Sequence, residues 1–280
     1  MIRLLVATTI TKMEYIFGTA FFLLGLIIGS FLNVVILRYR TGRTVLGRSA
    51  CFSCGVVLTW QDLIPVFSFL AIGGKCRSCG SKISIQYPLV EFLTGFIFLA
   101  VFCRAGFGTS PESLLSLVYF LIIWSLLTVI LVYDFKHKII PSGFVYTFAI
   151  LALINFLATT PIHLIWQAAG IYELLAGPIL FLPFFLVWYL SRGRMMGLGD
   201  GKLALGIGWM LGLAKGGTAI ILGFWIGAVV SVVILLLSKL GLSLDGKPLT
   251  IKSEVPFAPF LILGVLIVFL TEFNLFVIGL

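Results

Sequence analysis

Charged residues are scarce in this chain of 280 residues, because Asp, Glu, Lys and Arg together make up only 10% of it. Hydrophobic residues make up 61%, and the mean hydropathy is +1.20. A soluble globular domain typically carries about a quarter charged residues, so this composition excludes that class. We therefore expect an all-α polytopic membrane protein whose helices cross a lipid bilayer.

Acidic residues are the scarcer charge: 10 Asp and Glu stand against 19 Lys and Arg, which gives a net charge of +9. In a soluble protein such an excess would suggest nucleic-acid binding. In a membrane protein, Lys and Arg collect in cytoplasmic loops, so we expect no nucleic-acid partner. The two histidines, His137 and His163, stand apart in the sequence and predict no histidine metal cluster.

Long apolar runs predict about eight transmembrane helices, with a polar insert at 38–86 between the first two and a seven-helix membrane domain at 87–280. The sixth run is short, and Lys215-Gly216-Gly217 is expected to form the turn after it. Residues 1–12 are too weakly apolar for a signal peptide, and Met13 is an alternative start. The predicted spans are 15–37, 87–106, 114–133, 139–158, 174–190, 203–213, 218–237 and 257–279.

The basic residues predict the orientation of these helices. The insert and the loops at 134–138, 191–202 and 239–256 carry seven, two, three and three basic residues, whereas the opposite side carries four. The positive-inside rule makes the first side cytoplasmic. We therefore expect a small cytoplasmic insert and both termini outside.

Two aspartates lie at the ends of apolar runs, where acids are costly. Asp134 ends one run, and Asp200 follows two glycines in Gly197-Leu198-Gly199-Asp200-Gly201-Lys202. The chain crosses the membrane twice between them, so both aspartates belong at the same face. Two facing carboxyl groups can share one proton and act as acid and base on a water molecule. Each could instead be a helix cap or an ion-pair partner.

The short run at 203–213 bears on how water would reach Asp200. Eleven residues cover roughly 16 Å at about 1.5 Å per residue, against a hydrocarbon core of about 30 Å. Such a helix would leave Asp200 below the membrane surface with room for water. A helix that begins earlier, near Gly197, would weaken this inference.

Four of the five cysteines form two CxxC pairs, Cys51/Cys54 and Cys76/Cys79. Doubled pairs at this spacing are typical of a tetrahedral zinc site, and a reducing cytoplasm disfavours disulfides. We expect structural Zn²⁺ that holds the insert folded. The fifth, Cys103, is interpreted as a small buried apolar residue.

The motifs together resemble those of type IV prepilin peptidases, which are GxGD-type intramembrane aspartyl proteases. The resemblance runs from about residue 25 to 264, in the order of that family. It rests on Gly29–Arg38, the cysteine insert, Tyr87–Glu91, Asp134 with Ile140-Pro141, Gly197–Lys202 and Pro256–Phe260.

This resemblance implies that Asp134 and Asp200 are the catalytic pair, with Gly197, Gly199, Gly201 and Lys202 in the active-site motif. It implies cleavage of the basic leader of prepilins and pseudopilins of type IV pili or type II secretion, at the cytoplasmic face of the bacterial inner membrane. It also implies N-methylation of the new N-terminus from S-adenosylmethionine.

Two further acids are candidates for methyl transfer or leader binding: Glu91, about one turn into a predicted span, and Asp62 in the insert. Since the expected leader is basic and so is the cytoplasmic face, we predict local recognition by acids such as Glu91 or Glu254. No glycine-rich nucleotide loop after a strand indicates where S-adenosylmethionine binds. The alternatives are a leader peptidase without methylation and a zinc-regulated transporter, although no internal repeat favours the transporter.

Overall fold

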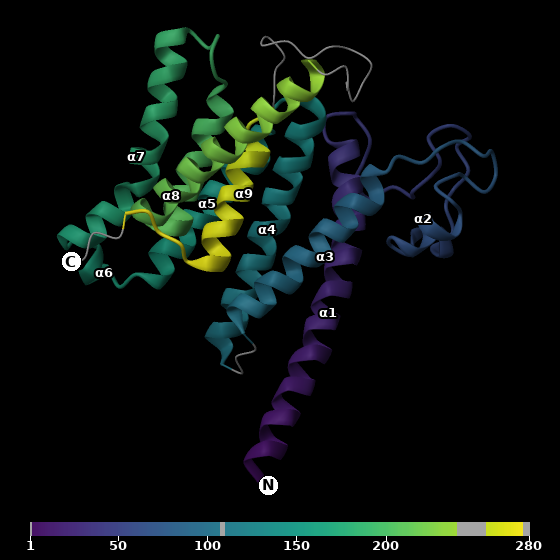
Figure 1. The fold of residues 1–280 in the computed structure, drawn as a ribbon, viewed down its shortest axis with the longest axis horizontal. Helices are drawn as coiled ribbons and strands as arrows, with labels where there is room; N and C mark the ends of the chain where they lie inside the picture. The colour runs from purple at the N-terminus through teal and green to yellow at the C-terminus, as the bar shows by residue number, and fades with distance from the viewer. Residues whose placement is uncertain (1, 107–109, 240–255, 277–280) are drawn as a thin grey trace. The chain divides into compact units, whose positions relative to one another are not determined.

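The computed structural model describes residues 2–106, 110–239 and 256–276, with side chains from residue 14 onward. These residues are mainly helical and include no β-strand longer than an isolated bridge (Figure 1). The helices are α1 (Ile2–Arg38), the short 3-10 helix η1 (Trp60–Leu63), α2 (Phe67–Ala71), α3 (Gln86–Ala105), α4 (Pro111–His137), α5 (Ser142–Thr159), α6 (Ile162–Ile165), α7 (Ala168–Ser191), α8 (Leu198–Lys239) and α9 (Ala258–Thr271).

Six of the described helices are long and apolar enough to cross a membrane, namely α1, α3, α4, α5, α7 and α8. The apolar helix α9 is shorter, at 14 residues. The expected all-α polytopic class is confirmed. The eight predicted runs correspond to seven elements, because residues 203–213 and 218–237 both lie within α8.

The long element α8 doubles back on itself at Gly212, whose φ of 78° and ψ of 175° are not helical. A Cβ on Gly216 would lie 3.4 Å from the Ile207 carbonyl oxygen and 3.5 Å from the Gly208 Cα. Residues eight apart in a straight helix are separated by about 12 Å. The element is therefore a helical hairpin, and its two arms contain the predicted sixth and seventh runs.

The predicted turn at residues 215–217 is wrong, since the reversal occurs at Gly212. The carboxylate of Glu173 explains why the reversal occurs at Gly212. It lies where a Cβ of residue 212 would be, and its Oε2 accepts the Leu213 backbone N–H at 3.3 Å. Only glycine tolerates that backbone geometry without strain.

The chain forms two compact units, residues 1–129 and 130–280. In the first unit α1 packs closely along α3. A Cβ on Gly25 would lie 2.7 Å from the Gly95 Cα, and one on Gly29 would lie 2.7 Å from the Glu91 Cα. Gly25 and Gly29, four residues apart, therefore form a small-residue packing face on α1.

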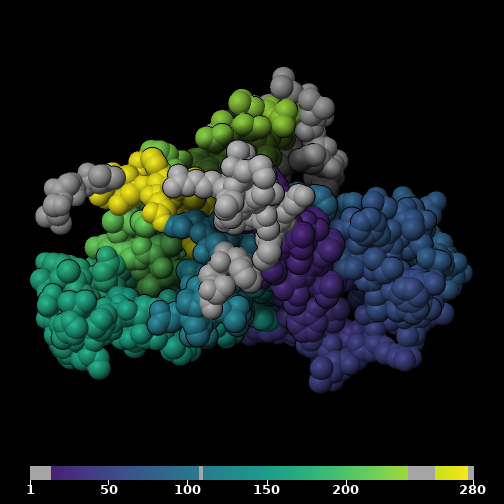
Figure 2. Space-filling view, turned by 90° about the horizontal axis from the view of Figure 1, so that it is seen from below, coloured from purple at the N-terminus to yellow at the C-terminus, as the bar shows by residue number. Residues whose placement is uncertain are grey.

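In the sequence, the insert connects α1 to α3. It belongs to the first unit and contains η1 and α2. Figure 2 shows these residues gathered in a lobe beside α1. The Asn33 amide of α1 donates to the Tyr87 carbonyl oxygen at 3.1 Å, at the start of α3. The two ends of the insert are thereby held together.

The core of the second unit is built around the α8 hairpin. Glycines lie at the closest helix crossings, where a side chain would not fit. Gly208 faces the Ala176 carbonyl of α7, and Gly264 of α9 faces the Ala219 carbonyl. The largest fully buried side chains here include Phe148, Leu203, Ile207 and Leu261.

Several helix boundaries differ from those predicted. The helix α1 begins well before residue 15, and the final predicted span extends into residues 277–279, which lie outside the described part. The helix α4 continues past Tyr133, which places Asp134 inside it. The helix α5 begins at Ser142, with Pro141 as its N-cap, and not at residue 139. Because α8 begins at Leu198, Asp200 lies in its first turn, and the argument for water access from a short sixth helix loses its support.

Candidate functional site

The carboxyl groups of Asp134 and Asp200 belong to one buried site in the second unit. Asp134 is 4% exposed and Asp200 is 8% exposed. Their charges interact electrostatically, although the two residues come from α4 and from the first turn of α8. The helix ends thus bring together the two aspartates that the count of membrane crossings assigned to the same face.

The two aspartates differ in their hydrogen bonding. Oδ2 of Asp134 accepts the backbone N–H of Ala258 at 3.2 Å. Ala258 is the first residue of α9, where free N–H groups and the helix dipole favour a negative charge. Oδ1 of Asp200 is buried and has no hydrogen-bond partner among the described residues. A buried carboxylate oxygen of this kind calls for a partner such as water, a proton or substrate.

The glycines beside Asp200 differ in how much space they have. A Cβ on Gly199 would lie 2.8 Å from the Ile140 Cβ, and one on Gly201 would lie 3.1 Å from the Phe184 Cβ. At Gly197 the nearest such atom is the Gly199 nitrogen, at 3.9 Å. Gly199 and Gly201 therefore allow α8 to start close to its neighbours, whereas Gly197 has open space.

Lys202 lies two residues beyond Asp200, but its side chain contacts an aromatic ring of another helix. Its Nζ lies over the ring of Tyr146 of α5, at 4.7 Å from the ring centroid. His137 packs near Tyr133, with ring centroids 4.5 Å apart. The first contact joins α8 to α5, and the second lies within α4.

The four cysteines of the two CxxC pairs form one cluster, with all four Sγ atoms within 4.8 Å of one another. The Sγ atoms of Cys51 and Cys79 are 3.9 Å apart. A tetrahedral zinc site with Zn–S bonds of about 2.3 Å requires S···S distances of about 3.8 Å. The donor set and its spacing therefore fit a tetrahedral thiolate-bound metal ion.

The two CxxC pairs share one local structure. The Cys51 N–H donates to Val56 O and the Gly55 N–H donates to Cys51 O, both at 2.9 Å. The second pair repeats this pattern with the donors Cys76 and Gly80 and the acceptors Ser81 and Cys76, again at 2.9 Å. The signal that sequence reasoning missed is a repeated C-x-S-C-G, in which both glycines adopt positive φ.

Backbone and hydroxyl donors stabilise thiolates in this cluster. The N–H groups of Cys54 and Ser53 and the Ser81 hydroxyl lower the pKa of Cys51 to about 6. The hydroxyl and N–H of Ser81 also lower the pKa of Cys79. Ser81 lies 3.1 Å from the Cys79 sulfur, which makes it a neighbour that supports two candidate ligands.

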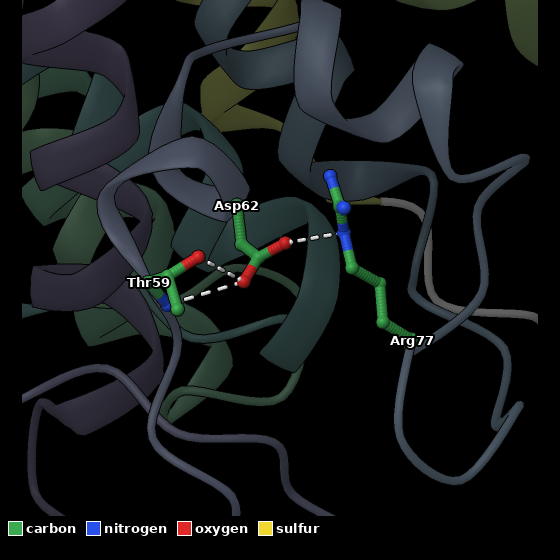
Figure 3. A network of polar contacts seen from close by, with 3 residues as sticks. All are labelled: Thr59, Asp62 and Arg77. Atoms are coloured by element: carbon green, nitrogen blue, oxygen red, sulfur yellow. Dashed lines mark hydrogen bonds and ion pairs between the residues drawn. The ribbon is translucent and has the colours of Figure 1, made fainter.

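Asp62, a candidate from the sequence, is engaged within the insert (Figure 3). Its Oδ2 accepts the hydroxyl and N–H of Thr59 at 2.7 and 3.1 Å, and its Oδ1 pairs with Nε of Arg77 at 2.8 Å. The Thr59 donors and the Arg77 charge lower the pKa of the Asp62 carboxyl. Asp62 thus ties η1 to the second cysteine pair.

Glu91, the other candidate, lies inside α3 and is 6% exposed. Its Oε2 accepts the backbone N–H of Val66 at 2.7 Å, and Ser30 of α1 donates a further hydrogen bond. Val66 has a positive φ of 61°, which is rare for a β-branched residue. The carboxylate therefore holds a strained point of the insert. Glu254, the third acid considered for leader binding, lies outside the described residues.

Comparisons with known proteins consistently assign the chain to one family. Residues 23–105 match the model of the bacterial peptidase A24 N-terminal domain, and residues 119–232 match that of the type IV leader peptidase family. No solved structure matches the chain.

Several relatives carry the name prepilin leader peptidase/N-methyltransferase. That of Xanthomonas campestris is 32% identical over 274 residues, covering 88% of each chain. That of Bacillus subtilis is 32% identical over 254 residues, covering 89% of this chain and 92% of the relative. That of Myxococcus xanthus is 34% identical over 227 residues, covering 79% of this chain but only 64% of the longer relative. The chain therefore belongs to the type IV leader peptidase family.

Proposed function

We propose that the protein is a membrane aspartic endopeptidase that cleaves the basic leader of type IV prepilins or pseudopilins. The observation that carries the proposal is the shared buried environment of Asp134 and Asp200, in which one carboxylate accepts an N–H and the other has an oxygen without a hydrogen-bond partner among the described residues. Family membership favours this activity over transport.

The two aspartates have different roles in this proposal. Asp134, hydrogen-bonded at the start of α9, is the carboxylate that accepts a proton from the attacking water. Asp200 is the protonated partner, which donates its proton to the oxygen of the scissile carbonyl. The water oxygen bonds to the carbonyl carbon and forms a tetrahedral diol. When the C–N bond breaks, the proton held by Asp134 passes to the leaving nitrogen, and the Asp200 carboxylate takes back a proton from one diol hydroxyl, which leaves the carboxylic acid product and restores both aspartates.

The test is cleavage of a peptide with a basic leader, a Gly-Phe junction and an apolar helix, by protein in vesicles. Asp134→Asn and Asp200→Asn should each abolish cleavage, because an amide cannot take either role. Glu173→Gln is the matched control, since it alters another carboxylate of the same unit and should cleave normally. Normal cleavage by both Asn variants would refute the proposal.

We further propose that the protein N-methylates the new N-terminus, as the names of its relatives indicate for those proteins. The methyl group moves from the sulfonium sulfur of S-adenosylmethionine to the amine nitrogen, which releases S-adenosylhomocysteine and a proton. Transfer of labelled methyl to a pre-cleaved peptide with N-terminal Phe tests this step independently of cleavage. A lack of transfer would leave the alternative of a peptidase without methylation.

For the insert, we propose a structural Zn²⁺ held by Cys51, Cys54, Cys76 and Cys79, supported by the mutual distances of the four sulfurs. Metal analysis of the purified protein should find one zinc per chain, and Cys→Ser at any of the four positions should remove it.

The proposed location is the bacterial inner membrane, with the aspartate site and the insert facing the cytoplasm. The support is the excess of basic residues in the loops on that side. Protease accessibility of the insert in inside-out vesicles, compared with intact cells, tests this orientation.

A further inference from the structure

The stretch between the two cysteine pairs, residues 60–72, is unusually apolar for part of an insert outside the membrane. Asp62 is its only charged residue, and Thr59 and Arg77 satisfy that carboxylate. Five large apolar side chains in it are nevertheless exposed: Trp60 (73%), Leu63 (44%), Ile64 (41%), Phe67 (64%) and Leu70 (68%). A concentration of exposed apolar side chains of this kind marks a surface that contacts lipid or a partner.

The position of Val66 fixes the depth of this stretch. Its N–H is bonded to Glu91, which lies five residues into α3. The helix α3 has 20 residues, which at about 1.5 Å each just span a hydrocarbon core of about 30 Å. Gln86 therefore lies near the edge of the core, and Glu91 lies about 7.5 Å further along the helix axis.

The segment around Val66 consequently lies at the depth of the bilayer interface and not above it. In Figure 1, α2 is drawn lower than the first turn of α3. Trp and Phe side chains favour this interfacial layer. Lys75 and Lys82, both exposed, follow the stretch and pair as an antiparallel bridge. Their charges suit anionic lipid headgroups.

We propose that residues 60–72 are an interfacial anchor that seats the insert in the anionic leaflet of the membrane, with Glu91 as the residue that holds it at that depth. Phe67 and Leu70 of α2, together with Trp60, enter the lipid, and Lys75 and Lys82 bind headgroups. This inference concerns the membrane contact of the insert and does not depend on the proposed peptidase activity.

The test places the photoreactive analogue p-benzoyl-phenylalanine at Phe67 or, as a matched control, at Phe52. The two phenylalanines are 64% and 66% exposed in the same insert, but Phe52 lies in the first cysteine pair with Arg43 over its ring, 5.3 Å from the centroid. The full-length protein is placed in vesicles of neutral lipid with 30% anionic lipid and illuminated. Lipid adducts are then identified by mass spectrometry from the increase in the mass of the protein.

Lipid adducts at position 67 should exceed those at position 52 at least fivefold, and should increase as the anionic fraction is raised from zero. Equal yields at the two positions would overturn the proposal, and independence from the anionic fraction would overturn the role of the lysines. Adducts that form with an added prepilin-like peptide in place of lipid would identify a substrate surface and would also overturn it.

The role of Glu91 is tested in the same assay. Glu91→Gln keeps an acceptor for the Val66 N–H and should retain the adducts at position 67, whereas Glu91→Leu should lower them toward the level at position 52. The zinc content of each variant reports whether the insert is folded. If Glu91→Leu retains both its zinc and its adducts, Glu91 does not position the anchor. If that variant loses its zinc, the comparison of positions 67 and 52 in the unaltered chain still decides the proposal.

Discussion

Replacing Gly199 by alanine should damage the aspartate site, whereas the same change at Gly197 should not. A Cβ at position 199 would lie 2.8, 3.1 and 3.3 Å from three atoms of the Ile140 side chain. The closest of these is the branched Cβ of Ile140, which cannot rotate away from the contact. At position 197 the nearest atom is 3.9 Å away, which is an ordinary contact.

The size of the effect follows from the overlap. Overpacking by one methyl group costs about 1–3 kcal/mol, and here the first turn of α8 must shift to relieve it. That turn carries Asp200. A displacement of about 1 Å at a reacting group can reduce a rate by about 100-fold. We therefore expect Gly199→Ala to lower kcat for leader cleavage by one to two orders of magnitude, with a smaller effect on KM.

The assay is initial-rate cleavage of a prepilin-like peptide in vesicles, with thermal unfolding in detergent as the check of folding. Gly197→Ala should stay within about twofold of the unaltered protein. Adding Ile140→Gly to Gly199→Ala removes all three contacting atoms and should restore part of the rate. Equal rates for the two alanine variants would refute the steric argument.

Three further outcomes are expected from the insert and the hairpin. Ser81→Ala should lower zinc affinity about tenfold in a competition with a chelator, because the hydroxyl supports the sulfurs of Cys51 and Cys79. In zinc-free protein, alkylation of Cys51 should accelerate as pH rises through about 6 and then level off, because its lowered pKa makes the thiolate the main form above that pH; continued acceleration to pH 9 would contradict this. Gly212→Ala should lower the free energy of unfolding by about 1–3 kcal/mol, measured in detergent, because its φ of 78° and ψ of 175° suit only glycine.

Hydropathy and charge were sufficient to predict the class of fold, because each membrane span must satisfy its backbone hydrogen bonds internally and must be apolar along its length. The parity of crossings between Asp134 and Asp200 is equally a property of the sequence. The position of the turn in α8 could not be predicted from the sequence in this way. Two adjacent glycines at 216 and 217 gave the stronger local signal, but Gly216 is needed for close packing, since its Cβ would lie 2.8 Å from Leu180. The reversal instead follows the carboxylate of Glu173, forty residues away.

The candidate roles of Asp62 and Glu91 show a similar limit. Their sequence context made them candidates for methyl transfer or leader binding, but it could not identify what they contact. Asp62 is bonded to Thr59 and Arg77, and Glu91 accepts hydrogen bonds from the strained Val66 N–H and from Ser30 of α1. Thr59, Arg77 and Val66 all belong to the insert, so these contacts depend on how the insert folds. An acid that the sequence presents as a substrate contact is, in Glu91, buried and already engaged.

The partner of Asp134 lies within the motif Pro256–Phe260, but the motif does not reveal that its backbone contacts the aspartate. The N–H of Ala258 reaches the carboxylate from 124 residues further along the chain, and a backbone donor leaves no signature in residue type. What the sequence does contain is Pro259, which follows Ala258 in the first turn of α9 and is favoured there. That proline helps to fix where α9 begins, and hence which N–H groups remain free to donate. The chemical difference between the two aspartates therefore depends on the start of a helix that neither aspartate belongs to. Shifting that start, for example by Pro259→Ala, should alter the aspartate site without changing any carboxylate.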